Sequence, residues 1–409
     1  GASTTGCLNI AIGELALGTA VTTGSNNVAI GKAAGEDIVA GCANVAIGCG
    51  AGKNISSGQN NVFLGHAAAE GTTTGCRNVG IGYLTLGGAV TGIHNVAIGS
   101  NAADAITCGA CNVAIGANAL GRSVTSCMNI AIGVQAMGNS VTTGTDNIAI
   151  GCLAGDALTS GYNNVAIGKG TGGAFTTGFH NTAVGSDAGA DISCGCYSVA
   201  IGSNAVNNVT QGLGNIGVGY SAANGITTGD RNVMIGYNAG ANPEVSGNRS
   251  ESIALGNETT THFYVTVGVT DPSDKRDKTD VADMDLGLDY VKALRPVYYK
   301  WDKRGWYDDW NTPEKIQSNI AGYKSYKPDG SKKQSRWELG FLAQESLAAE
   351  KAHTSKTGDG TVDEGLIVGG TDDGGYNMTH ERLFAPIVKA IHELDAKIVA
   401  LTTRVTDLE

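Results

Sequence analysis

Three groups of residues in this chain are of types that do chemistry in proteins: cysteines, acidic residues within a repeated region, and a serine followed closely by a lysine. All ten cysteines lie between Cys7 and Cys196, and Cys108 and Cys111 form one Cys-x-x-Cys pair. Because no second pair follows at the spacing of a zinc site, we expect no metal and no cofactor. We interpret the cysteines as free thiols that act as small apolar residues. Interchain or inter-coil disulfides are the alternative, which assembly in a reducing cytoplasm would oppose.

The acidic residues and the serine–lysine pair do not by themselves identify a catalytic site. A polysaccharide-degrading enzyme needs two carboxylates across a groove, but the acids of the repeated region fall among turn residues, for example Glu36, Asp37, Asp187 and Asp191. The repeated region also lacks Trp as a sugar platform. Ser273 and Lys278 lie in the charged segment 271–278, where such a pair is most often part of a solvated turn. Whether these acids, or the serine and lysine, can act in catalysis therefore depends on the secondary-structure elements that position them.

The composition of the chain indicates β-structure built from small residues. Among 409 residues there are 62 Gly and only 6 Pro, while 42% are apolar and 16% charged. Collagen is excluded because Gly does not recur at every third position, and disorder is excluded by the apolar content. The net charge of −11 offers no basic footprint, so we expect no nucleic-acid partner. No apolar stretch is long enough to span a membrane and no signal peptide opens the sequence, so we expect no membrane insertion.

The strongest signal in the sequence is an internal repeat of the motif Asn-(Val/Ile)-Ala-Ile-Gly. Fifteen copies are spaced by 17 residues, except for two spacings of 18 and a last one of 20. The copies begin at Asn9, Asn27, Asn44, Asn61, Asn78, Asn95, Asn112, Asn129, Asn147, Asn164, Asn181, Ser198, Asn215, Asn232 and Ser252. Gly stands three residues before most copies, Ala seven after their start, and a larger apolar residue eleven after it in many. This register predicts a β-solenoid of about 15 coils.

Each copy of the motif predicts one coil. Val-Ala-Ile alternates with the period of a strand, and the following Gly closes the strand where the backbone turns with φ > 0. We expect a second short strand, near the Ala and larger apolar positions, to return the chain. The Asn side chains are expected to form a ladder that bonds backbone groups of neighbouring coils. A helical repeat of twice the length is the rival interpretation, and Gly at both ends of every strand argues against it.

The two faces of each predicted strand suggest how chains associate. The β-branched residues point one way and Ala the other, and the Ala face is apolar but small enough for another backbone to approach closely. We interpret the Ala face as the contact between three parallel chains. A monomeric solenoid with a thin second core is the alternative. The motif resembles the Val-Ala-Ile-Gly head repeats of trimeric autotransporter adhesins, although the coils of those repeats are shorter.

Residues 271 to 409 carry a different set of motifs. A Ser-Asp-x-Arg-x-Lys sequence comes first, formed by Ser273, Asp274, Arg276 and Lys278. Residues 288–301 then predict a helix running into a strand, and a Tyr-Asn-Met sequence at 376–378 precedes a terminal helix. Between them lies a Gly-Phe-Leu-Ala-Gln-Glu sequence that contains Gly340, Phe341, Gln344 and Glu345. These motifs, in this order, resemble the endosialidase-type intramolecular chaperones found at the C-termini of phage tailspikes and tail fibres.

The resemblance implies self-cleavage by a serine–lysine dyad. Ser273 would be the nucleophile and Lys278 the general base, which requires burial that disfavours the charged form of the lysine. The cleaved bond would adjoin Ser273. Pro272–Ser273 is the chemically simplest choice, because the hydroxyl can reach the preceding carbonyl, and Ser273–Asp274 is the alternative.

The end of the chain predicts a coiled coil. Apolar residues alternate at spacings of four and three, as a coiled-coil seam requires: Ile387, Ile391, Leu394, Ile398, Leu401, Val405 and Leu408. Ile or Val at one seam position with Leu at the other is typical of two strands, whereas the resemblance implies three. We follow the resemblance, because the shaft and the globular part must share one symmetry.

The sequence thus predicts a mainly β protein with four segments: a β-solenoid shaft over 1–256, a connecting strand over 257–272, a small α+β chaperone and autoprotease domain over 273–380 and a coiled-coil helix over 381–409. We expect a homotrimeric, structural and adhesive tail fibre or tailspike-like protein, assembled in the host cytoplasm and carried on the virion. Its expected partners are a glycan or protein receptor on the host surface and other tail proteins. Single-turnover autoproteolysis is the enzymatic activity expected. The alternatives are a polysaccharide-degrading tailspike and a cellular trimeric surface adhesin.

Overall fold

The structure is a computed structural model, and it describes residues 6–18, 21–241, 247–257, 260, 264, 275, 278–279, 281–302, 329–354, 365–370 and 376–408. The chain divides into two compact units, Gly1–Thr260 and Thr261–Glu409. The first unit holds the repeats and the second holds the chaperone-like motifs. None of the described helices is long and apolar enough to cross a membrane.

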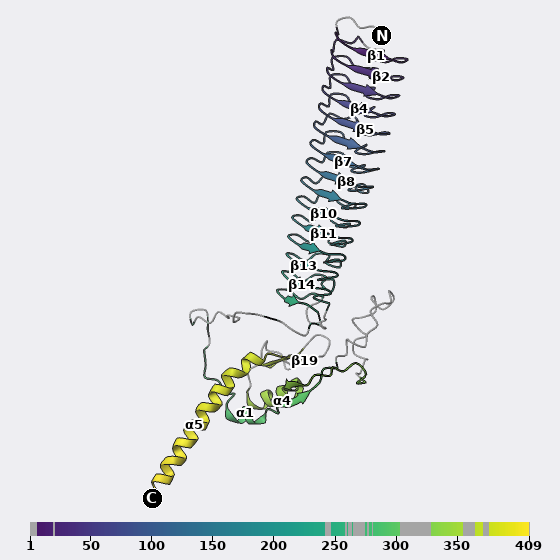
Figure 1. The fold of residues 1–409 in the computed structure, drawn as a ribbon. Coiled ribbons are helices and arrows are strands. Elements are labelled where there is room, and N and C mark those ends of the chain that lie inside the picture. Colours follow the sequence, from purple (N-terminus) through teal and green to yellow (C-terminus); the bar gives the residue numbers. More distant parts are fainter. Residues whose placement is uncertain are drawn as a thin grey trace. The chain divides into compact units, whose positions relative to one another are not determined.

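The first unit is a β-solenoid of about 14 turns in which fifteen three-residue strands form one parallel sheet in sequence order, as Figure 1 shows. Every strand pair aligns equal positions of the motif, so the predicted 17-residue solenoid is confirmed. The strands are β1 (Ile10–Ile12), β2 (Val28–Ile30), β3 (Val45–Ile47), β4 (Val62–Leu64), β5 (Val79–Ile81), β6 (Val96–Ile98), β7 (Val113–Ile115), β8 (Ile130–Ile132), β9 (Ile148–Ile150), β10 (Val165–Ile167), β11 (Thr182–Val184), β12 (Val199–Ile201), β13 (Ile216–Val218), β14 (Val233–Ile235) and β15 (Ile253–Leu255).

The return path of each coil differs from the prediction, because no second strand forms among the described residues of the shaft. Turns, bends and isolated bridges lead from one strand to the next. Gly48 closes β3 with φ 133°, and Gly50 and Gly52 follow with left-handed φ values of 69° and 53°. The same two positions of the first coil are left-handed although Leu15 and Leu17 occupy them. Left-handed residues that alternate with ordinary ones prevent an extended strand.

The Ala face of each strand points into its own coil, so its assignment as the contact between chains was wrong. Ala29, Ala46 and Ala97 are all 0% exposed in the single chain. They share one core with two other sets of apolar residues in each coil, which lie seven and eleven residues after the start of the motif. Ala51 and Ile55 are fully buried examples of these two sets. Each coil contains only one strand, and these three sets of residues fill its interior. At the inward position of the strand they leave room for little more than a methyl group in most coils.

Two places in the shaft show how closely this interior is packed. Phe63 replaces the inward Ala in β4, and the residue paired with it in β5 is Gly80. A Cβ on Gly80 would lie 3.2 Å from the Phe63 ring. A second inward glycine, Gly217 of β13, makes room for Val206, because a Cβ there would lie 2.6 Å from the Val206 side chain. A large inward residue is accommodated by the loss of a side chain beside it, as expected of a close-packed core.

The predicted Asn ladder is confirmed. The backbone N–H of Asn44 donates to Oδ1 of Asn27 at 3.0 Å, and Nδ2 of Asn44 donates to the same oxygen at 3.1 Å. Nδ2 also donates to the carbonyl of Gly58, in the next coil, at 2.9 Å. A Cβ on Gly41 would lie 2.6 Å from this carbonyl oxygen. The ladder therefore explains both the Asn and the Gly three residues before it.

The second unit contains a small α+β region and a helical end, both as predicted. Its described elements are α1 (Leu288–Ala293), β16 (Val297–Tyr299), β17 (Glu338–Gly340), α4 (Ala343–His353), β18 (Val368–Gly370), β19 (Tyr376–Met378), η4 (His380–Leu383) and α5 (Phe384–Thr406). β16 pairs antiparallel with β17, and β18 with β19. The core of this region includes Leu286, Tyr290, Leu347, Ile367 and Leu383. Together η4 and α5 form a 27-residue helical end.

Candidate functional site

The Gly-Phe-Leu-Ala-Gln-Glu motif lies at the junction of β17 and α4. Gly340 ends β17, and a Cβ there would lie 3.2 Å from the Tyr299 ring of the paired strand. Phe341 is half-buried and packs against the core of the unit. Gln344 is exposed in the first turn of α4. Gly340 and Phe341 thus fix how the helix leaves the strand, while Gln344 remains accessible.

Glu345, the last residue of this motif, forms a forked ion pair with Arg295. Nε of Arg295 lies 2.8 Å from Oε2 of Glu345, and Nη2 lies 2.6 Å from Oε1. Hydrogen bonding to Arg295 lowers the pKa of Glu345, and the same bond raises the pKa of Arg295. Both side chains are exposed, so the pair adds more to geometry than to stability. It joins two motifs that are 50 residues apart.

Glu350 is a buried carboxylate whose role the sequence did not reveal. It is 1% exposed and accepts hydrogen bonds from the backbone N–H groups of Leu366, Ile367 and Val368. A Cβ on Gly365 would overlap this carboxylate, so the glycine lets the segment approach α4. The sequence signal that could have indicated this contact is Gly365, which stands directly before the apolar residues that lead into β18. Because three N–H groups satisfy the buried charge, Glu350 anchors β18 to α4.

Tyr290 of α1 lies in the same core and is fully buried. Burial, together with the charge of Glu350, raises the pKa of Tyr290 to about 12. Its ring makes an edge contact with His353, with ring centres 6.1 Å apart. Tyr290 is therefore neutral at physiological pH and serves the packing of α1 against α4.

A second acidic residue, Glu393, connects α1 with α5. Its Oε2 accepts the backbone N–H of Leu288, the first residue of α1, at 2.8 Å. Its Oε1 lies 3.3 Å from Nζ of Lys389. The hydrogen bond from Leu288, followed by the interactions with Lys389, lowers the pKa of Glu393. A carboxylate at a helix N-terminus satisfies an amide that the helix cannot. Glu393 therefore caps α1 from the terminal helix.

The predicted dyad falls only partly within the described structure. Lys278 is exposed, and its backbone N–H donates to the carbonyl of Lys275 at 3.3 Å. The burial that a neutral lysine base requires is therefore not present in the single chain. The other residues predicted around the cleavage site lie outside the described residues, namely Pro272, Ser273, Asp274 and Arg276.

No element of the described part of the chain covers the predicted coiled-coil seam of α5. All seven seam residues are exposed, by 40% at Ile387 and 53% at Ile398, up to 87% at Leu408 beyond the end of the helix. Only Pro386 and Ala390 of α5 are buried. An apolar stripe of this spacing is typical of a helix that packs against copies of itself.

The shaft shows no cluster suited to catalysis in its described part. All ten cysteines are free thiols in the single chain, and no group of three or more metal-ligating residues occurs among the described residues. Of the turn acids, Glu36 pairs with Lys53 at 3.6 Å, and Asp187 accepts a hydrogen bond from the Ser186 hydroxyl at 2.9 Å. Both acids are half-buried in their turns, and each is satisfied by a local polar partner.

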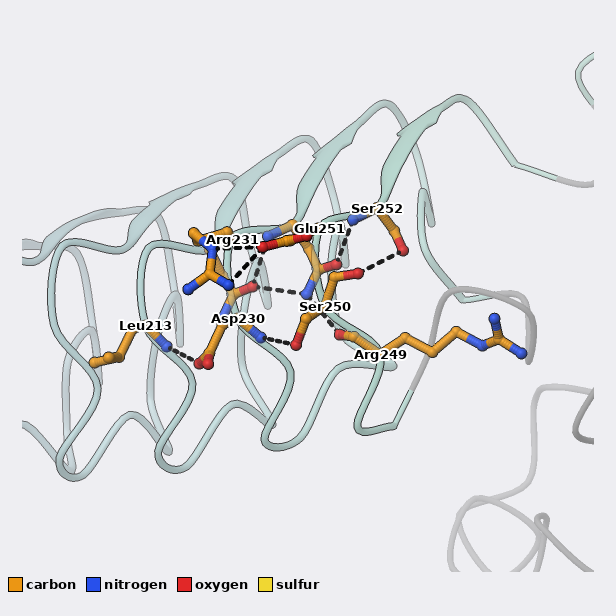
Figure 2. A network of polar contacts seen from close by, with 9 residues as sticks. Leu213, Asp230, Arg231, Arg249, Ser250, Glu251 and Ser252 are labelled. Atoms are coloured by element: carbon orange, nitrogen blue, oxygen red, sulfur yellow. Dashed lines mark hydrogen bonds and ion pairs between the residues drawn. The ribbon is translucent and has the colours of Figure 1, made fainter. Parts of the chain in front are cut away.

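The last coils of the shaft carry a polar network instead (Figure 2). Nε and Nη2 of Arg231 lie 3.1 and 2.6 Å from Oε1 of Glu251. Asp230 accepts the backbone N–H of Leu213 at 2.8 Å, and its own N–H donates to the Ser250 hydroxyl at 2.9 Å. The spacing between motif copies is 20 residues here instead of 17. The network thus ties the longest coil to the coils before it.

Comparison with known protein families finds a match within the second unit. Residues 273–354 match the family model described as chaperone of endosialidase, so the chain carries a domain of that family directly after its β-solenoid. No curated protein matches the chain. The matched segment includes α1, β16, β17 and α4, and with them both Arg295 and Glu345. Domains of this kind occur in phage tail fibres and tailspikes and typically act in trimeric proteins.

Proposed function

We propose that this chain is a homotrimeric tail fibre or tailspike-like protein with an adhesive shaft, whose C-terminal domain directs assembly and then cleaves itself off next to Ser273. The observation that carries the proposal is the chaperone-of-endosialidase domain at residues 273–354, placed after a solenoid of fifteen strands. The receptor on the host surface, the other tail proteins as partners and the location on the virion belong to this proposal.

The contact between the three chains is assigned to the Val/Ile face of the sheet, in place of the Ala face. Ile81, Ile150, Ile167, Ile201 and Ile235 are 36% to 43% exposed in the single chain. They stack with the first residue of each strand, usually Val or Ile, into one apolar stripe along the shaft. Contiguous apolar stripes of this length on a folded chain mark association surfaces. Three copies of the stripe, packed together, remove it from water.

The terminal helix supports the same assembly. Its exposed seam brings three C-termini together through contacts that are local in sequence. The coils of the shaft then form by stacking, each on the one before. This step is slow when the three chains are not already held in register with one another. Glu393 joins α5 to α1, so the seam and the globular part are held as one body within the unit. This is a physical reason for an assembly domain at this end.

Self-cleavage is proposed to follow assembly. The Ser273 hydroxyl attacks the carbonyl carbon of Pro272, while Lys278 accepts the hydroxyl proton and returns it to the leaving amine of Ser273. Water then hydrolyses the ester, which leaves a carboxylate on Pro272 and a free amine on Ser273. Lys278 must be neutral to act as base, and it is exposed in the single chain. The required burial is therefore assigned to the assembled trimer, which makes cleavage a report of correct folding.

Denaturing gels of the wild type, Ser273→Ala and Lys278→Ala test this function. We expect two fragments from the wild type and one full-length band from each variant. Lys275→Ala is the matched control, because Lys275 is an exposed lysine of the same segment, and it should cleave normally. Full-length wild type under native assembly conditions, or cleavage of Ser273→Ala, would refute the dyad. Light scattering on the same samples should give three chains per particle, and a stable monomer would refute the trimer.

A further inference from the structure

We propose that four aromatic side chains on three consecutive coils form a binding site for a neutral glycan chain. We call this set the aromatic ladder: Tyr162, Phe179, His180 and Tyr197. They stand one or two residues before the motif that starts β10, β11 and β12, at the corner where each coil enters its strand. The inference rests on the proposed adhesive role of the shaft and names the place and the ligand class of that adhesion.

The rings contact one another from coil to coil. Tyr162 and Phe179 stack with ring centres 4.9 Å apart and planes within 4°. His180 and Tyr197 stack at 5.4 Å with planes within 10°. The two stacks meet edge to face, since Phe179 and Tyr197 lie 5.4 Å apart at 83°. The four rings therefore form one continuous surface that runs along the shaft.

This surface is not part of the core of the coils. Tyr162 and Tyr197 are 40% and 60% exposed, His180 is exposed and Phe179 is half-buried. Other coils carry small residues at the same corner, such as Ala43 and Ala110, and stack equally well. Only eight of the 23 Phe, Tyr and Trp residues lie in the shaft, and three of them are in the ladder. The solenoid itself thus does not require these rings.

The backbone conformation does not single out these rings. His180 and Tyr197 have φ values of 56° and 59°, in the left-handed region. The same position is left-handed in other coils, at Asn26 but also at residues as large as Arg77 and Met128. The conformation therefore belongs to the turn of the coil, and it is the stacking and exposure of the rings that set these three coils apart.

The chemistry of the ladder fits a neutral glycan. The C–H face of a pyranose packs against the negative face of an aromatic ring, and two Tyr hydroxyls and one imidazole supply hydrogen bonds to sugar hydroxyls. The corner segments of these coils and the coil before them, residues 143–146, 160–163, 177–180 and 194–197, contain no Lys or Arg and one acid, Asp146. A sulfated, sialylated or uronic-acid sugar would find no fixed positive charge here. A row of rings along the shaft matches an extended chain of sugars better than a single one.

The test uses the full chain on an array of linear neutral hexose oligosaccharides and their sialylated and uronic-acid counterparts. We expect binding to at least one neutral chain, weakened by about tenfold or more in Tyr162→Ser/Tyr197→Ser. The matched control is Tyr220→Ser/Tyr237→Ser, because these two tyrosines are also exposed and stacked, at 5.2 Å, on another corner of the shaft. The control should bind as the wild type does.

Several outcomes would overturn the proposal: no binding to any neutral glycan, preference for the acidic ones, or equal affinity in both double variants. Loss of the trimer in Tyr162→Ser/Tyr197→Ser alone would also overturn it, by showing that the ladder lies in a contact between chains. Trimer formation and cleavage at Ser273 are scored on the same samples. If the trimer forms and is cleaved but no neutral glycan binds, only the glycan site is refuted. If trimer formation or cleavage fails, the proposed assembly function is refuted instead.

Discussion

Replacing Asn112 by Ala removes one rung of the Asn ladder from the middle of the shaft. The side chain is 1% exposed. Its Nδ2 donates to Oδ1 of Asn95 at 3.0 Å and to the carbonyl of Ser126 at 2.8 Å. Its Oδ1 accepts the backbone N–H of Asn129 at 3.0 Å. The substitution therefore deletes three hydrogen bonds and leaves the Ser126 carbonyl and the Asn129 N–H without these partners.

The free energy that this removes follows from the three bonds. A buried neutral hydrogen bond contributes about 1 kcal/mol, and an unsatisfied buried group costs about as much again or more. We expect Asn112→Ala to destabilise the surrounding coils by about 3 kcal/mol. Asn112→Asp should destabilise them further, because it places a buried carboxylate against the two oxygens that Nδ2 now contacts.

Hydrogen exchange read by mass spectrometry is the appropriate assay, because repeat arrays need not unfold in a single step. Exchange in the coils of β6, β7 and β8 should become faster by about a hundredfold, the ratio that corresponds to about 3 kcal/mol. Asn54→Ala is the control: Asn54 is half-buried in another coil and its side chain makes no hydrogen bond within the described part of the chain. Equal exchange in the two variants would show that the ladder does not hold the coils together.

Three further predictions test the core, the cap of α1 and the seam. Gly80→Ala should destabilise the shaft in thermal melts by about 1 to 3 kcal/mol, because the added Cβ would lie 3.1 Å from the Thr85 hydroxyl and 3.2 Å from the Phe63 ring. The penalty should be smaller in a Phe63→Ala background, and an unchanged penalty would contradict the contact with Phe63. Because folding lowers the pKa of Glu393, its contribution to stability is complete above the ordinary carboxyl pKa and is lost as the pH falls through the lower, folded value. Amide protection of α1 should therefore drop as the pH is lowered below the ordinary carboxyl range, and the same drop in Glu393→Gln would assign it to another group. Leu394→Asp should abolish the trimer in light scattering while Lys397→Asp, on an exposed non-seam position of α5, retains it.

The register of the shaft could be predicted from the sequence because each column has one physical cause. Asn44 recurs because its side chain bonds two coils at once, and Gly41 because a neighbouring carbonyl occupies the space of a side chain. The missing second strand could not be predicted. Its cause is left-handed backbone at residues with ordinary side chains, such as Leu15 and Leu17, and their residue types give no sign of that conformation.

The chaperone domain could be located from its motifs, but the contacts that organise it could not. Glu345 was identified as part of a motif, whereas its partner Arg295 is 50 residues away in the sequence. Glu350 and Glu393 look like ordinary surface acids on helices, and only the packing of other segments against them reveals that they bind backbone amides. Such roles depend on tertiary contacts, which a local pattern does not encode.

The direction of the strand faces is the point on which the sequence was most misleading, and it connects the shaft to its chaperone. Alternation in Val-Ala-Ile separates two faces, but both are apolar, so hydrophobicity does not decide which one is buried. The narrow coil decides it, because most coils admit only Ala at the inward strand position, and the larger Phe63 is accommodated beside Gly80. The larger residues must then face outward on every strand. A single folded chain consequently presents a long apolar stripe that invites aggregation. The proposed trimer removes that stripe from water, and a domain that aligns three chains before the coils stack gives the stripe its correct partner first.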